Sequence, residues 1–126
     1  MPDPYYADAA WYLEAIRAPE AWAAGYNGSG VQILINDNGV DNTHPDLAKL
    51  DLANSCGVYA PCADSDGVMD SHGTVCASLA AGDSNSACGV GVAPGAGIAS
   101  CTMMGDNVAS EFYDESYISH HHDVND

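Results

Sequence analysis

Residues 31–39 read VQILINDNG, and this stretch decides how the rest of the sequence is interpreted. Four of the first five residues are apolar and turn-forming residues flank them, which is the pattern of a buried strand. The strand runs directly into the polar residues 36–39. Because ligands and chemistry in open α/β sheets gather at the carboxyl ends of the strands, this end is the functional one. The stretch therefore predicts a buried strand that presents a carboxylate, Asp37, at its functional end.

The segments on either side predict an α/β crossover. The strand of residues 31–35 is preceded by one or two short helices and followed by a long loop, a helix and a second buried strand. Pro19 suits a first helical turn, and Asp70 and Ser71 cap the later helix. The expected bounds are 9–24 for the first helices, 40–71 for the loop with a short strand at 49–53, 73–81 for the later helix and 97–103 for the second strand.

The chain divides into three parts. Residues 1–30 form an arm, helices and a turn; residues 31–105 form the strand–loop–helix–strand core; residues 106–126 form an acidic, histidine-containing tail. The run His120 to His122 lies near the chain terminus, and consecutive histidines point in different directions. We therefore interpret the tail as disordered rather than as a metal site.

The charge balance excludes several kinds of partner. Two Lys and Arg residues stand against 18 Asp and Glu, for a formal net charge of −16. Nucleic-acid binding needs cations that neutralise phosphates, so it is excluded, and an anionic membrane surface is disfavoured. No apolar run in the sequence reaches the length of a membrane span. The acidity favours a hard cation such as calcium or a basic substrate.

Five cysteines are many for a chain of 126 residues. They form no Cys-x-x-Cys pairs, which argues against structural zinc, and their number indicates an oxidising compartment. Cys56 and Cys62 bracket a short loop, so a bridge between them is one expectation. Cys76 is expected to be a buried free thiol, and Cys88 to be half of a disulfide with a later partner.

Three segments carry residues suited to chemistry. DNG at 37–39 follows the first strand, HGT at 72–74 begins the later helix, and GVGVAP at 89–94 enters the second strand. A carboxylate bound to one nitrogen of an imidazole fixes the tautomer and leaves the other nitrogen to take a proton. Asp37 and His72 could form such a pair, although a strand-end Asp and a helix-start His also occur as simple capping residues.

Together with HPDL at 44–47, these segments resemble the subtilase family of serine endopeptidases. Cys76 after HGT, and Cys88 before GVGVA, are similar to the kexin and proprotein-convertase branch. The resemblance implies an α/β fold that is part of a subtilisin-like, mostly parallel sheet with flanking helices, here incomplete. The open sheet edge would make the piece marginally stable.

The resemblance implies that Asp37 orients the imidazole and that His72 is the general base. The family's nucleophile lies in a later Gly-Thr-Ser segment, and neither that segment nor the oxyanion-hole asparagine occurs in these 126 residues. We therefore expect this chain alone to be inactive. Asn38 and Asp70 are expected to contact substrate, although Asp70 would equally serve as a helix cap. Convertases commonly have an acidic residue where Asn38 stands, so a preference for paired basic residues stays open.

The resemblance also implies a structural calcium site, whose ligands are all oxygens. The expected partners are a peptide or protein substrate and an inhibitory propeptide, and the complete protein is expected in the secretory lumen or outside the cell. The expected calcium ligands are Asp3, Asp46, Asp83, Asn85, Ala87 and Gly89.

Three function classes remain in order of preference. The chain is part of an active serine endopeptidase, or a catalytically dead remnant that binds calcium or a partner, or a small acidic calcium-binding protein unrelated to proteases. The third class requires the ordered motifs to be coincidence and ranks last. A Gly-Thr-Ser segment downstream would separate the first class from the second.

Overall fold

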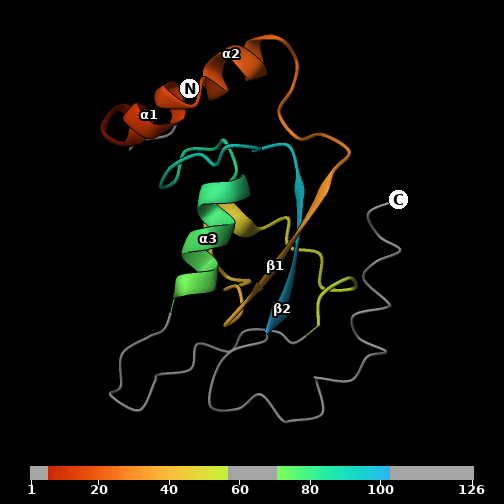
Figure 1. Cartoon of the computed structure of the whole chain (residues 1–126). Helices are drawn as coiled ribbons and strands as arrows, with labels where there is room; N and C mark the ends of the chain where they lie inside the picture. The colour runs from red at the N-terminus through yellow and green to blue at the C-terminus, as the bar shows by residue number, and fades with distance from the viewer. Residues whose placement is uncertain (1–5, 57–70, 103–126) are drawn as a thin grey trace.

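The structure is a computed structural model, and it describes residues 6–56 and 71–102 (Figure 1). Its elements follow the order helix, helix, strand, short 3-10 helix, helix, strand. Their bounds are α1 Tyr6–Ala15, α2 Ala18–Ala23, β1 Gln32–Asp37, η1 Pro45–Leu47, α3 His72–Ala81 and β2 Gly97–Thr102. The expected α/β order is confirmed, and the predicted strands and later helix lie within two residues of the observed ones.

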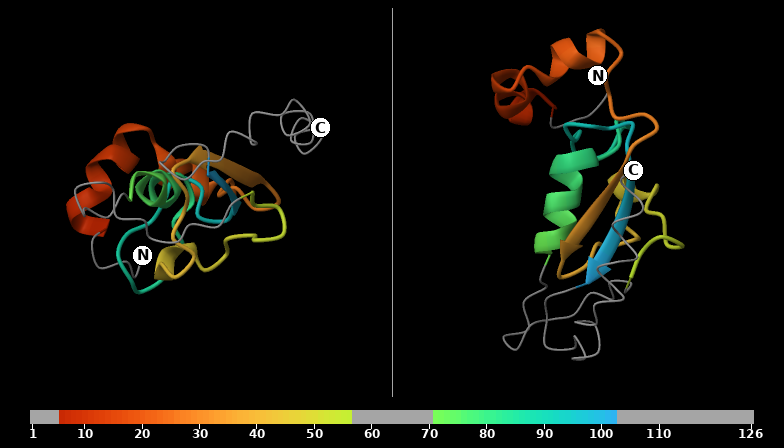
Figure 2. Two further views of the ribbon diagram at one scale, coloured as in Figure 1. Left: turned by 90° about the horizontal axis from the view of Figure 1, so that it is seen from below. Right: turned by 45° about the vertical axis from the view of Figure 1, so that its right-hand side comes forward.

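The two strands pair in parallel, from Gln32 opposite Gly97 to Asp37 opposite Thr102. Parallel neighbours need a crossover connection, and α3 lies within it, against one face of the pair (Figure 2). Both strands therefore end at the same edge, the edge that carries Asp37. The expected short strand at 49–53 is absent from the described residues. Two isolated parallel bridges replace it, from Leu50 to Ile98 and from Cys56 to Cys101.

Small side chains set the distance between α3 and the sheet. Ala77 and Ala81 of α3 are fully buried against Ile98 of β2 and Val40 after β1. An alanine surface lets a helix approach closely, so a compact core forms without large aromatic residues. The same crowding holds at Gly91, where an added Cβ would lie 2.6 Å from the Ala81 backbone nitrogen.

The N-terminal helices form a second, smaller cluster. Leu13 and Ala18 pack with Val90, and Tyr12 and Trp22 lie partly buried against them. The Trp22 indole N–H donates to the Val92 carbonyl at 2.8 Å, which ties α2 to the loop before β2. The break at 16–17 that separates α1 from α2 is where Arg17 adopts a left-handed φ of 62°. Pro19 lies in the first turn of α2, as the sequence predicted.

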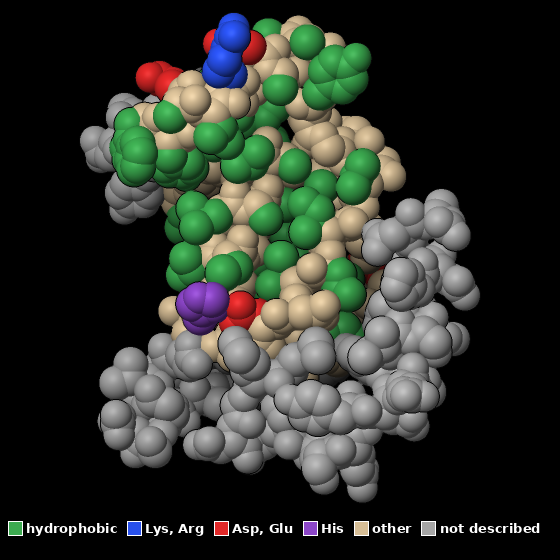
Figure 3. Space-filling model, in the orientation of Figure 1, with side chains coloured by type: hydrophobic (Ala, Val, Ile, Leu, Met, Phe, Trp, Pro, Cys, Tyr) green, Lys and Arg blue, Asp and Glu red, His purple; other side chains and the backbone are tan. Residues whose placement is uncertain are grey.

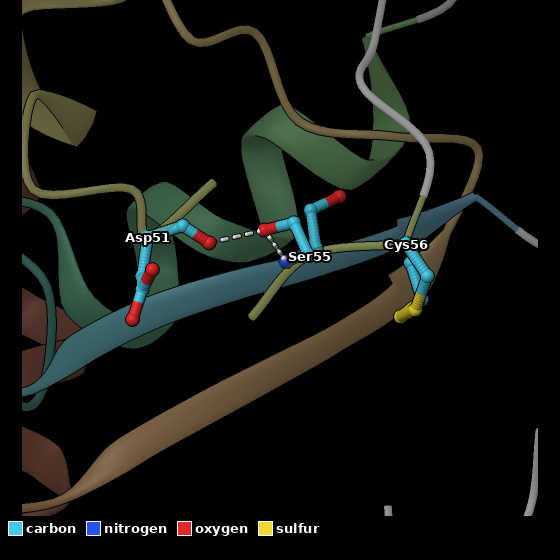
Figure 4. Close-up of a disulfide and its surroundings, with 5 residues drawn as sticks. Asp51, Ser55 and Cys56 are labelled. Carbon is cyan, nitrogen blue, oxygen red and sulfur yellow. Dashed lines mark hydrogen bonds between the residues drawn. A yellow bond between two sulfur atoms is a disulfide. The ribbon is translucent and has the colours of Figure 1, made fainter. Parts of the chain in front are cut away.

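A disulfide joins Cys56 to Cys101, not to Cys62 as the sequence suggested (Figure 4). Cys56 N donates to the Ser100 carbonyl at 2.8 Å, and Thr102 N donates to the Cys56 carbonyl at 2.9 Å. These strand-like bonds bring the two thiols side by side, whereas proximity in sequence suggested the other pair. The disulfide therefore links β2 to the segment that ends at Cys56, which also forms isolated bridges with this strand.

Hydrophobic side chains gather on the face that carries α3 (Figure 3). Val75 and Leu79 project from that helix with about half of their surface exposed, and Trp11 of α1 is exposed as well. Within the described residues, no helix combines the length and the apolar character that a membrane crossing requires.

Candidate active site

Asp37 is the last residue of β1, and only 8% of its surface is exposed. The backbone N–H of Asn38 donates to its Oδ1 at 2.8 Å. The apolar residues of β1 are only partly buried, so the strand is half-buried rather than buried as the sequence predicted. Ile33 and Ile35 still pack against the core, and pairing with β2 holds the backbone, so the carboxylate is presented from a regular element at the carboxyl edge of the sheet. Its position agrees with the sequence prediction.

His72 is the first residue of α3, and its Nδ1 lies 2.9 Å from Oδ1 and 2.8 Å from Oδ2 of Asp37. The ring therefore donates its Nδ1 hydrogen to the carboxylate, a tautomer assigned from this contact. The side chain of His72 is 66% exposed, while that of Asp37 is 11% exposed. A buried carboxylate thus orients an imidazole that solvent or a substrate can reach.

A close backbone approach makes this pairing possible. Gly73 follows the histidine, and a Cβ there would overlap the Gly39 carbonyl oxygen and lie 3.1 Å from the Asp37 Cβ. Gly39 itself has a φ of 109°, a left-handed conformation that favours glycine. The Asp41 N–H adds a 3.0 Å bond to the buried Thr74 hydroxyl. The glycines of the two motifs therefore let the loop after β1 and the first turn of α3 touch.

Asn38 is turned toward the helix. Its Oδ1 accepts the Gly73 N–H at 2.8 Å, within the first turn of α3. Ser71 occupies the N-cap position, but its side chain makes no capping bond, so the expected cap from that residue is wrong. The substrate contact expected of Asn38 stays a prediction.

Cys76 is a free thiol whose Sγ lies 3.8 Å from His72 Nδ1. It is half-buried, rather than buried as expected. Asp37, His72 and Cys76 bring one ligand atom each to within 4.8 Å of one another. The signal for this neighbour was present in the sequence, because residues four apart on a helix share a face.

The described calcium-ligand candidates converge on Asp46. This carboxylate is 2% exposed and accepts the Asn85 side-chain amide at 3.0 Å and the Gly89 N–H at 3.3 Å. Asn85 Oδ1 in turn accepts the Ala87 N–H at 2.6 Å, and Asp83 N donates to the Asp46 carbonyl at 2.9 Å. The loop after α3 and the 3-10 helix therefore form one polar cluster, and the calcium site expected there stays a prediction.

Neutral groups dominate the contacts of this cluster. Lys49 does not contact Asp46 in any described bond; it pairs with the Asp83 carboxylate at 2.9 Å and donates to the Pro94 carbonyl. Burial raises the pKa of the nearby Cys88 thiol, and the charge of Asp46 acts in the same direction. Cys88 therefore stays neutral near pH 7. Its sulfur forms no disulfide among the described residues, and its predicted pairing with a later cysteine stays a prediction.

Two predicted site residues, Asp3 and Asp70, lie outside the described residues, as does the tail of residues 106–126. Lys49 and Thr74 were missed by the sequence analysis. A lone lysine and a helical threonine carry no local signal, since their partners lie 34 and 33 residues away.

A carboxylate–imidazole pair at the carboxyl edge of a parallel sheet is an arrangement on which serine-type acyl-transfer sites are built. The model of the subtilase family matches residues 28–125. The chain belongs to the subtilase family. Within the family it is kexin- or proprotein-convertase-like, as the following relatives show.

Neuroendocrine convertase 2 of Bos taurus is 38% identical over 112 residues, covering 83% of this chain and 18% of the relative. Furin of Bos taurus is 37% identical over 119 residues, covering 78% of this chain and 14% of the relative. A crystal structure of Aeromonas sobria serine protease in complex with the chaperone ORF2 superposes with a TM-score of 0.55 and 30% identity, covering 66% of this chain and 14% of that one. The chain thus spans less than a fifth of the length of these relatives.

Proposed function

We propose that this chain supplies the aspartate and the histidine of a serine endopeptidase active site. The observation that carries the proposal is the contact of the buried Asp37 carboxylate with His72 Nδ1 at 2.8 Å. With Nδ1 held, Nε2 is the nitrogen that takes the proton from a serine hydroxyl as it attacks a peptide carbonyl, and later returns it to the leaving amine. Asp37 stabilises the imidazolium between those steps.

The remaining parts of the proposal concern the complete protein. Its substrate is a peptide or protein, and a propeptide or chaperone-like partner is supported by the complex that the Aeromonas sobria serine protease forms with the chaperone ORF2. The Cys56–Cys101 disulfide supports a secretory or extracellular location, where such bonds persist. The alternative, a catalytically dead binding remnant, would keep the fold without an assembled active site.

A fluorophosphonate probe tests the catalytic proposal directly, because it labels only an activated serine. The purified 126-residue chain is expected to remain unlabelled, since it contains no Gly-Thr-Ser segment. The reading frame beyond Asp126 should be sequenced, and the complete protein tested beside a known subtilase as positive control. Labelling of the 126-residue chain, or a complete frame without a serine segment, would overturn the proposal.

We also propose that Asp46 and the loop of residues 83–89 hold a structural calcium ion. The buried Asp46 carboxylate is met by neutral donors, so its charge is not offset by a contacting cation in the described residues. An ion with oxygen ligands would offset it, using the side chains of Asp46 and Asn85 and backbone carbonyls of the loop. The ion would fasten the loop after α3 to the 3-10 helix and would take no part in the reaction.

Calcium is expected to raise the unfolding temperature of the chain, with about 2.7 kcal/mol of stabilisation at a calcium concentration 100 times the Kd. Asp46→Asn should abolish this increase, because it removes the central charge. Glu14→Gln removes one exposed charge on α1 and should leave the increase intact. Thermal unfolding in calcium and in EGTA measures the effect, and equal calcium responses in wild type and Asp46→Asn would refute the site.

A further inference from the structure

A backbone N–H in the first turn of α3 is capped by a side chain from a distant part of the chain, the loop after β1. A helix begins with backbone N–H groups that have no partner within the helix, and the N-cap side chain normally accepts one of them. Here Ser71 stands at the N-cap and its side chain makes no such bond. The Gly73 N–H, at the second position of the helix, instead donates to Oδ1 of Asn38 at 2.8 Å.

Asn38 is adjacent to the carboxylate that orients the histidine. Its own N–H donates to Asp37 Oδ1 at 2.8 Å, so one residue bonds the aspartate through its backbone and the helix through its side chain. Because the Gly73 N–H needs an acceptor, the amide oxygen of Asn38 must face the helix. The residue thereby spans the two motifs, which are 35 positions apart in the chain.

The fit leaves little freedom at this contact. Asn38 Oδ1 lies 2.9 Å from the position a Cβ would occupy on Gly73, and Gly73 is buried. His72 precedes Gly73 directly, so any shift of the first helical turn moves the imidazole relative to Asp37. A long, mobile surface contact could not impose this precision, whereas a short amide on a strand-end loop can.

We infer that Asn38 is a positioning residue that caps the histidine helix from the aspartate loop and so fixes His72 against Asp37. This inference rests on the proposed function, in which the Asp37–His72 pair is catalytic. It assigns the Asn38 side chain a role toward the protein itself, in addition to the substrate contact expected from sequence. An aspartate at this position would keep the acceptor and place a favourable negative charge at the helix N-terminus.

The test uses NMR of the 126-residue chain, because the His72 tautomer and its hydrogen-bonded Nδ1 proton report the pair without any catalysis. Asn38→Ala is expected to lose the downfield Nδ1 proton resonance, mix the two tautomers, and speed exchange of the Gly73 amide about fivefold, the factor of a typical lost cap. Asn38→Asp should restore all three. Asn42→Ala, in the exposed part of the same loop, is the matched control and should behave as wild type.

The outcomes separate this inference from the proposed function. If Asp37→Asn leaves the His72 signals unchanged, the catalytic pair itself is wrong. If the signals depend on Asp37 but Asn38→Ala retains them, only the positioning role is overturned, even where the variant is less stable. Should Asn38→Ala not fold, Asn38→Asp decides, because a folded Asn38→Asp chain without the wild-type His72 signals would overturn the inference.

Discussion

Asp37→Asn is expected to lower kcat of the complete protein by about 10⁴-fold while KM changes little. Both carboxylate oxygens of Asp37 lie within 2.9 Å of His72 Nδ1, so the carboxylate selects the tautomer that donates from Nδ1. An asparagine can turn its NH₂ group toward the ring and select the other tautomer, in which Nε2 carries the hydrogen and cannot act as a base. Steady-state hydrolysis of a fluorogenic peptide measures both constants.

The matched control for this prediction is Asp51→Asn. It makes the same chemical change in a turn whose carboxylate accepts from Asn54 and Gln32 rather than from the histidine. Its kcat should stay within a few-fold of wild type. A loss of less than tenfold in Asp37→Asn would show that the carboxylate does not set the state of His72, and the proposed mechanism would then fail.

Local patterns were sufficient to predict the elements that build the site. The apolar run before Asp37 predicted β1, and the run of small apolar residues after His72 predicted α3. In both segments the residue types and their pattern favour one kind of secondary structure. A crossover between parallel strands then brings the carboxyl end of β1 and the start of the next helix to one edge. The proximity of Asp37 and His72 therefore follows from the order of the elements.

Contacts between distant segments could not be predicted in the same way. Nothing in the sequence around Asn38 indicates that its amide oxygen caps a helix 35 residues later. Polar side chains commonly follow a strand, and the sequence does not show which of them contacts a distant helix. The partner of Cys56 was mistaken for a related reason. Cys62 is close in sequence, but pairing follows the distance between Cα atoms in the fold, which is 4.5 Å for Cys56 and Cys101.

That disulfide leads to the largest expected effect on stability. Reduction of the Cys56–Cys101 bond should lower the free energy of unfolding by about 4 kcal/mol, because it releases a closed loop in the unfolded chain. The two cysteines are 45 residues apart, and the loop between them includes all of α3 and most of β2. A total stability of about 5–15 kcal/mol is usual for a domain, so reduction would remove a large part of it.

Urea unfolding with and without a phosphine reductant measures this loss, and Cys76→Ala separates the bond from the other thiols. Cys76 is a free cysteine on α3, so its variant should lose as much stability on reduction as wild type does. The double variant Cys56→Ala, Cys101→Ala should instead be unaffected by the reductant.

In the folded protein, Ser55 Oγ also accepts the Ser100 N–H at 3.0 Å (Figure 4), so the segment that ends at Cys56 keeps this contact with β2 after reduction. The expected loss therefore comes from the unfolded state, and a change below about 1 kcal/mol, or peptide mapping that joins Cys56 to Cys62, would contradict it.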